Sequence, residues 1–85
     1  MAINLLLVDD KAENLFVLEQ LLAQPDRQLF RASSGNDALR LLLKHDFAAV
    51  LLDVEMRGMD GYETAELMRG TERTEHVPII FVTAG

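Results

Sequence analysis

The chain has 85 residues, enough for one small domain, and we expect a single domain over residues 1–85. Hydrophobic residues make up 49% of the sequence and charged residues 26%, a composition typical of a folded globular domain. Eight Lys and Arg stand against fourteen Asp and Glu, and the basic residues form no cluster. Direct contact of this segment with nucleic acid is therefore not expected. The absence of cysteine excludes disulfides and thiolate metal sites.

The sequence shows no signal for secretion or for insertion into a membrane. Its first ten residues, MAINLLLVDD, lack a cationic start, and two aspartates end their short apolar run. No apolar run approaches the roughly 18 residues that a membrane helix requires. We therefore expect a cytoplasmic location and no contact with membranes.

The first half of the chain predicts a strand, a helix and a second strand. Ile3–Val8 is apolar except for Asn4, which is typical of a strand covered on both faces. The next segment, which includes the sequence VLEQLLAQ, is predicted to be a helix because its leucines have the spacing of one helical face. Pro25 and Asp26 are expected to end this helix. These leucines are Leu15, Leu18 and Leu22. The second strand is expected at residues 28–32.

The second half predicts two more helices and two more strands. Ser34 is a candidate N-cap with Asp37 three residues later, and this helix should end near His45. Asp60 and Glu63 have the spacing of a second capped helix, which should end at Gly70. Strands are expected at residues 48–53 and 78–83. The apolar face of the helix after Ser34 is predicted to consist of Ala38, Leu39, Leu42 and Leu43.

Strands that alternate with helices indicate an α/β fold, with a doubly wound parallel sheet covered by helices on both faces. The carboxyl ends of parallel strands meet at one edge of the sheet, where such folds bind ligands. Those ends carry Asp9 and Asp10 on the first strand, Asp53 on the third and Thr83 on the fourth. We therefore expect three carboxylates and a hydroxyl to converge.

Three carboxylates that meet at the ends of neighbouring strands repel one another unless they retain protons or bind a cation. Oxygen ligands without His or Cys favour a hard ion, and Mg²⁺ suits a site with few protein ligands. With the charge offset, a carboxylate such as Asp53 could attack phosphorus and form an acyl phosphate. Thr83, at the end of the adjoining strand, could donate its hydroxyl to the phosphoryl group.

Three segments, LLLVDD, VLLDVEMRGMDG and PIIFVTA, together resemble the receiver domain of two-component response regulators. The resemblance covers the whole chain and implies a flavodoxin-like sheet with strand order 2-1-3-4. It implies that Asp53 accepts a phosphoryl group from a histidine kinase or phosphotransfer protein, and that Thr83 is the switch residue. Asp10, Asp53 and the backbone carbonyl of Glu55 would bind Mg²⁺ directly, with Asp9 assisting. Such a domain takes part in its own phosphorylation, so an enzyme with an external substrate is not expected.

The sequence departs from the family pattern in two places. Arg57 occupies a position that is usually proline, which we expect to alter the rigidity of the loop or access to the site. The sequence also ends after the fourth strand, where a receiver continues through a helix, a strand with an essential lysine, and a last helix. Lys11 does not match that lysine and is expected to be solvated. We therefore expect impaired phosphorylation, and self-association through the exposed fourth strand.

Other functions fit the sequence less well. A degenerate receiver, acting as a phosphorylation-independent interaction module, is favoured by the missing lysine and disfavoured by the intact acidic residues. A dinucleotide-binding domain would need glycines after the first strand, where this chain has VDDKAEN. A magnesium-dependent phosphohydrolase would place its paired acids after the first strand rather than at Asp53 and Glu55. Near the site, Gly61 is expected to permit a turn and Met56 to pack in the core.

Overall fold

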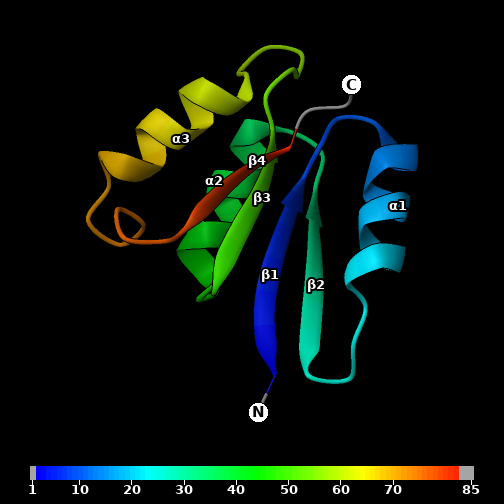
Figure 1. The fold of residues 1–85 in the computed structure, drawn as a ribbon. Coiled ribbons are helices and arrows are strands. Elements are labelled where there is room, and N and C mark those ends of the chain that lie inside the picture. Colours follow the sequence, from blue (N-terminus) through cyan, green and yellow to red (C-terminus); the bar gives the residue numbers. More distant parts are fainter. Residues whose placement is uncertain (1, 83–85) are drawn as a thin grey trace.

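Four strands alternate with three helices in the computed structural model, which describes residues 2–82 (Figure 1). The elements are β1 (Ile3–Val8), α1 (Ala12–Leu22), β2 (Arg27–Ala32), α2 (Gly35–Lys44), β3 (Ala49–Asp53), α3 (Gly61–Arg69) and β4 (Ile79–Val82). This order is the predicted one. The predicted bounds differ by a residue at the starts of β2, β3 and β4, and the first helix ends earlier than predicted. Its C-cap, Ala23, is already extended, two residues before Pro25.

The four strands form one parallel sheet in the order β2-β1-β3-β4, which confirms the predicted topology. β1 pairs with both β2 and β3, so that Leu5 is matched with Leu29 on one side and with Ala49 on the other. Within residues 2–82, β4 pairs only with β3 and is therefore an edge strand. The strand order reverses between β1 and β3, and this is where ligands bind in sheets of this kind.

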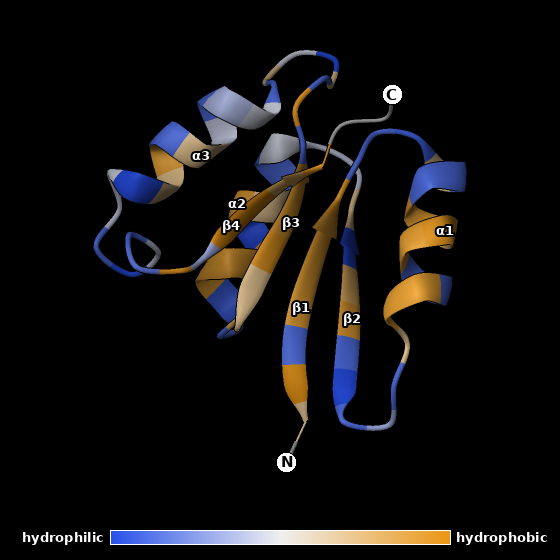
Figure 2. Cartoon of the chain, viewed as in Figure 1, coloured by the Kyte–Doolittle hydropathy of each residue, from blue (hydrophilic) through white to orange (hydrophobic). Residues whose placement is uncertain are grey.

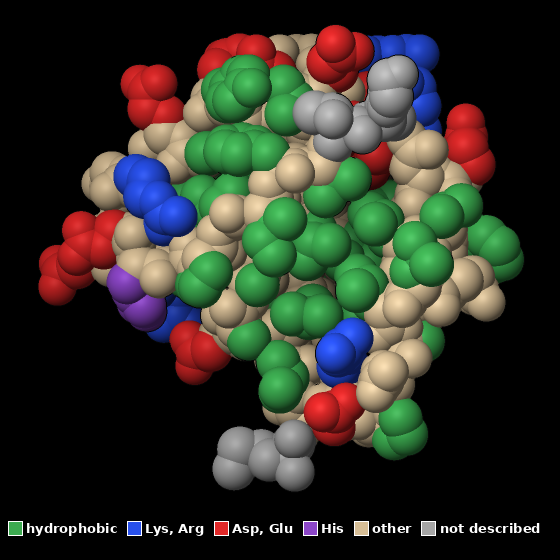
Figure 3. Space-filling model, in the orientation of Figure 1, with side chains coloured by type: hydrophobic (Ala, Val, Ile, Leu, Met, Phe, Trp, Pro, Cys, Tyr) green, Lys and Arg blue, Asp and Glu red, His purple; other side chains and the backbone are tan. Residues whose placement is uncertain are grey.

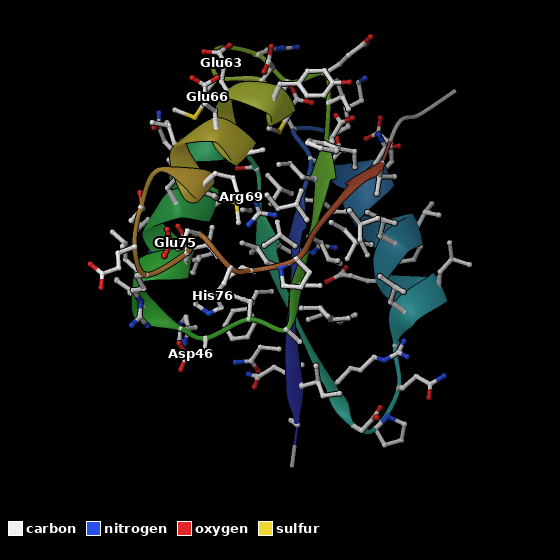
Figure 4. The ribbon with its side chains drawn as sticks, turned by 60° about the vertical axis from the view of Figure 1, so that its left-hand side comes forward. Asp46, Glu63, Glu66, Arg69, Glu75 and His76 are labelled. Carbon is white, nitrogen blue, oxygen red and sulfur yellow. The ribbon has the colours of Figure 1, made fainter. Side chains whose placement is uncertain are left out.

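The sheet lies between two layers of helices, with α1 on one face and α2 and α3 on the other (Figures 1 and 4). The main core fills the α2 and α3 side, and the strands that supply it are apolar along most of their length (Figure 2). Buried members of this core are Leu6, Val8, Val50 and Leu52 from the sheet, Ala38 and Leu42 from α2, and Met68 from α3. Removing these side chains from water is the main force that holds the layers together.

Caps fix the beginnings of α2 and α3 as predicted. The Asp37 N–H donates to Ser34 Oγ at 3.0 Å, and the Glu63 N–H donates to Asp60 Oδ1 at 2.9 Å. The apolar face of α2 was predicted incompletely, because Leu43 is 59% exposed. Leu41 packs against the core in its place. Leu41 and Leu43 lie about 100° to either side of Leu42 around the helix axis, and the rotation of α2 against the sheet brings Leu41 toward the core and leaves Leu43 exposed.

The connection between α3 and β4 is held by side chains that donate to main-chain carbonyls. Arg69 Nη1 donates to the carbonyl oxygens of Glu75 at 2.7 Å and Val77 at 2.8 Å, and Figure 4 shows Arg69 beside this segment. The buried hydroxyl of Thr74 donates to the carbonyl of Met68 at 2.7 Å. The Thr74 bond satisfies a hydroxyl that burial would otherwise leave unpaired. Together the three bonds hold the segment that leads into β4.

Hydrophobic side chains gather on the sheet face that carries α1 (Figure 3). Ile80 of β4 is 52% exposed, and its strand partner Leu51 is only half-buried. On the opposite face, Phe81 is also exposed and its ring contacts Tyr62 of α3 with centroids 5.1 Å apart. β4 thus combines an unpaired edge with apolar side chains on both faces. None of the helices within residues 2–82 has the length and hydropathy needed to span a lipid bilayer.

Candidate functional site

Three aspartates meet where the strand order reverses. Asp9 and Asp10 directly follow β1, and Asp53 is the last residue of the neighbouring strand β3. Each offers a carboxylate oxygen, and the three oxygens lie within 4.8 Å of one another. Asp9 is 3% exposed and Asp53 is 5% exposed, whereas Asp10 is half-buried. The parallel strands therefore bring together the three carboxylates whose convergence the sequence predicted.

Asp9 is held by donors from the residues that directly follow it. The main-chain N–H of Lys11 donates to Oδ1 at 2.9 Å, and the side-chain amide of Asn14 donates to Oδ2 at 3.1 Å. Both carboxylate oxygens of Asp9 are thus engaged in hydrogen bonds, which fix the orientation of the side chain. Sequence reasoning missed Asn14, although a polar residue in the first turn of a helix after an acidic pair is a signal that could have found it.

Asp10 is held differently from Asp9. Its Oδ2 accepts a hydrogen bond at 3.0 Å from the main-chain N–H of Arg57, on the loop that follows β3. Its Oδ1 is buried and has no hydrogen-bond partner among the residues that the structure describes. A buried, unpaired carboxylate oxygen is costly unless a cation or another ligand satisfies it. This atom is therefore a ready ligand for a metal ion.

Burial raises the pKa of Asp53, and the nearby negative charges of Asp9 and, more weakly, Asp10 add to this. The main-chain N–H of Glu55 and the positive charge of Lys11 oppose the increase in the pKa. Lys11 is exposed, as expected, yet its charge still acts on Asp53. The raised pKa shows that burial, and then the neighbouring negative charges, disfavour the ionised form of Asp53, and a bound cation would favour it.

The donor set fits a magnesium ion. The cluster of Asp9, Asp10 and Asp53 offers oxygen ligands only, as hard divalent cations require, and Asp10 Oδ1 is buried without a partner within residues 2–82. A cavity of about 490 Å³ opens beside Asp10, and the exposed loop residue Glu55 forms part of its lining. Its lining residues are Asp10, Lys11, Val54, Glu55, Met56, Arg57, Asp60 and Tyr62. The predicted switch residue, Thr83, lies outside the described residues.

Two glycines shape the loop between Asp53 and α3. Gly58 has a φ of 70°, a backbone conformation that favours glycine. Gly61 was predicted to permit the turn before α3; its φ is not positive, so glycine is needed there for a different reason. A Cβ at Gly61 would lie 2.1 Å from the carbonyl oxygen of Asp53. Gly61 therefore allows α3 to approach the end of β3. Met56, in the same loop, is buried in the main core as predicted.

The fold and the acidic cluster at the reversal of strand order define the class of protein as a flavodoxin-like α/β domain with a candidate metal site. The sequence model described as "Response regulator receiver domain" matches residues 5–85, and the chain belongs to this family. It is a receiver domain of two-component signalling, as the sequence motifs predicted. The degenerate alternative gains no support from these matches.

Relatives and solved structures agree with this assignment. The chain is 40% identical over 80 residues to a probable cyclic di-GMP phosphodiesterase of Vibrio cholerae, covering 94% of this chain and 18% of that protein. The N-terminal domain of a response regulator receiver protein from Methanoculleus marisnigri JR1 superposes with a TM-score of 0.90 at 32% identity, over 96% of this chain and 67% of that one. The receiver domain of sensor histidine kinase PA1611 from Pseudomonas aeruginosa PAO1 does so with a TM-score of 0.90 at 29% identity, over 100% and 70%. That structure has a magnesium ion coordinated in its active site cleft.

The curated relatives are much longer than this sequence. The chain spans 18% of the Vibrio protein and 18% of the response regulator PleD of Caulobacter vibrioides, to which it is 32% identical over 84 residues. The segment shared with these relatives is thus one module of larger proteins.

Proposed function

We propose that this receiver domain is a cytoplasmic, phosphorylation-dependent switch that accepts a phosphoryl group on Asp53. The donor would be a histidine kinase or a phosphotransfer protein, and the reaction would require Mg²⁺. One observation carries this proposal. Three carboxylates lie within 4.8 Å of one another at the reversal of strand order, and one of them has a buried oxygen without a partner among residues 2–82.

Each residue of the cluster has a distinct part in the proposed reaction. An oxygen of Asp53 attacks the phosphorus of a phosphohistidine, so that an O–P bond forms, the P–N bond breaks and the imidazole leaves. Asp10, Asp53 and the carbonyl of Glu55 would hold Mg²⁺ directly, and Asp9, whose oxygens are already engaged, would assist through water. When bound, Mg²⁺ offsets negative charge on the carboxylates and the phosphoryl oxygens. Thr83 is proposed as the switch residue that reports the phosphoryl group.

The domain would act on itself and on no external substrate, because the carboxylate that attacks phosphorus also carries the product. The alternative is an interaction module that keeps the fold without phosphorylation. The raised pKa of Asp53 favours phosphorylation, as does the buried Asp10 oxygen that has no partner within the described part of the chain, since an interaction module needs neither.

The test is covalent labelling with acetyl phosphate and Mg²⁺, followed by intact-mass and peptide mass spectrometry. Any phosphoryl group that the wild type gains should lie on the peptide containing Asp53, at the reduced level expected of impaired phosphorylation, and the labelling should disappear without Mg²⁺. Asp53→Asn should abolish it, whereas Asp26→Asn, the same change at an exposed turn residue, should leave it intact. Labelling that persists in Asp53→Asn would remove Asp53 as the acceptor.

We further propose that the chain self-associates through β4. Among the described strands, β4 has one unpaired edge, and Ile80 is 52% exposed beside it. Exposed apolar edge strands readily pair with another chain. Sedimentation should show concentration-dependent dimers that Ile80→Lys weakens. Leu21→Lys, on α1 where Leu21 is 73% exposed, should not weaken them. A monodisperse monomer at high concentration contradicts this proposal.

A further inference from the structure

We propose that Arg57 is a positioning residue for the metal site, acting through its main-chain N–H rather than through its side chain. The N–H donates to Asp10 Oδ2 at 3.0 Å and so holds the carboxylate in the rotamer that keeps Oδ1 buried and unpaired within residues 2–82. The inference rests on the proposed function, because it assigns to Arg57 a part in binding the ion that phosphorylation requires.

The position of the Asp10 carboxylate depends on this hydrogen bond more than the position of the Asp9 carboxylate depends on either of its own two hydrogen bonds. Within residues 2–82, the Arg57 N–H is the only donor to the Asp10 carboxylate. Asp9 receives two donors, and both come from positions within five residues of it. The bond to Asp10 instead joins positions 47 residues apart, from the loop after β1 to the loop after β3. Without this hydrogen bond, the side chain of Asp10 would remain free to change rotamer until the ion binds. The entropy lost in fixing the rotamer would then oppose binding and weaken it.

The same bond fixes one metal-binding loop relative to the other. Asp53 ends β3 directly before this loop, and Glu55 lies in the loop two residues before Arg57; both are proposed ligands. A hydrogen bond from Arg57 to Asp10 therefore sets the distance between the two groups of ligands before the ion arrives. Pre-set geometry of this kind raises metal affinity because less reorganisation accompanies binding.

The side chain of Arg57 is not required for this role. Arg57 is exposed, and its guanidinium makes no hydrogen bond or ion pair with the described residues. Any residue with a main-chain N–H can serve, and proline alone cannot. The proline that is usual at this position in receiver sequences has no such donor, so the bond strengthens a metal site rather than creating one. This difference provides a matched pair of variants, Arg57→Ala and Arg57→Pro.

The test is a calorimetric titration with Mg²⁺, without any phosphoryl donor, of the wild type, Arg57→Ala and Arg57→Pro. Losing a donor to a metal-binding carboxylate typically costs 10- to 100-fold in affinity, and for this exposed bond we expect about tenfold in Arg57→Pro. Arg57→Ala should stay within about twofold of the wild type, since it keeps the N–H. In NMR spectra of the wild type and Arg57→Ala, the amide of residue 57 should shift as Mg²⁺ is added.

A second variant separates the N–H from the backbone restriction that proline imposes. A synthetic chain with an ester in place of the amide at residue 57 removes the donor and leaves the side chain in place. It should bind Mg²⁺ as weakly as Arg57→Pro. The inference is wrong if both bind as tightly as Arg57→Ala, or if Arg57→Ala is as weak as Arg57→Pro.

The outcome for the wild type distinguishes this inference from the proposed function. If the wild type binds Mg²⁺ and is labelled on Asp53 while Arg57→Pro binds normally, only the role of Arg57 is lost. If the wild type binds no Mg²⁺, the proposed function and the role of Arg57 fail together.

Discussion

Replacing Asp53 with asparagine should stabilise the metal-free protein at neutral pH, although it removes the proposed phosphoacceptor. The carboxylate oxygens of Asp9, Asp10 and Asp53 lie within 4.8 Å of one another. Two like charges at that separation repel by roughly 3 kcal/mol at an effective dielectric constant of about 20. The Glu55 N–H and the charge of Lys11 offset part of this repulsion. We therefore expect a net gain of about 1–3 kcal/mol in the free energy of unfolding.

The gain should depend on pH in a defined direction. The pKa of Asp53 is raised in the folded state, so the folded protein binds this proton more tightly than the unfolded chain does. Stability from protonation is complete below the unfolded pKa and is lost as the pH rises through the folded pKa. Asp53→Asn avoids that loss at pH 7. At about pH 3, Asp53 of the wild type is protonated in both the folded and the unfolded state, so the stability advantage of Asp53→Asn should vanish.

Thermal unfolding monitored by circular dichroism measures the effect. For a domain of this size, the expected gain corresponds to a Tm increase of about 5 °C or more at pH 7 without metal. The control is Asp26→Asn, which makes the same charge change at an exposed turn. Added Mg²⁺ should stabilise the wild type more than Asp53→Asn. The electrostatic reasoning would be refuted if Asp53→Asn and Asp26→Asn changed the Tm equally. It would also be refuted if the gain in stability of Asp53→Asn persisted at low pH.

Three further substitutions test how the structure positions the site. Gly61→Ala should destabilise the fold by more than about 2 kcal/mol in urea unfolding, because its Cβ would lie 2.1 Å from the Asp53 carbonyl oxygen. Gly70→Ala should cost far less, because its Cβ would lie 3.6 Å from the Glu66 carbonyl oxygen, an ordinary contact distance. Asp60→Ala should cost about 1 kcal/mol by removing the N-cap of α3, and recovery in Asp60→Asn would support capping as the cause. Arg69→Met should speed amide hydrogen exchange between α3 and β4, since two carbonyls lose their donor; unchanged exchange would contradict this role.

The sequence by itself determined the alternation of strands and helices and the edge of the sheet at which function is placed. Apolar runs such as Ile3–Val8 predict buried strands, and the Ser34 and Asp60 caps predict where α2 and α3 begin. Both signals are local, so they can be read from neighbouring residues. The aspartates at the ends of β1 and β3 were predicted to meet because parallel strands place their carboxyl ends at one edge.

Only the tertiary structure decided how the aspartates are held and what the nearby residues do. The bond from Arg57 to Asp10 spans 47 positions, and the close approach of Gly61 to Asp53 depends on how α3 meets β3. The exposure of Leu43 likewise depends on the rotation of α2 against the sheet. Sequence periodicity identifies which face of an element is apolar. It does not contain the distances between elements, which are set by packing many side chains at once.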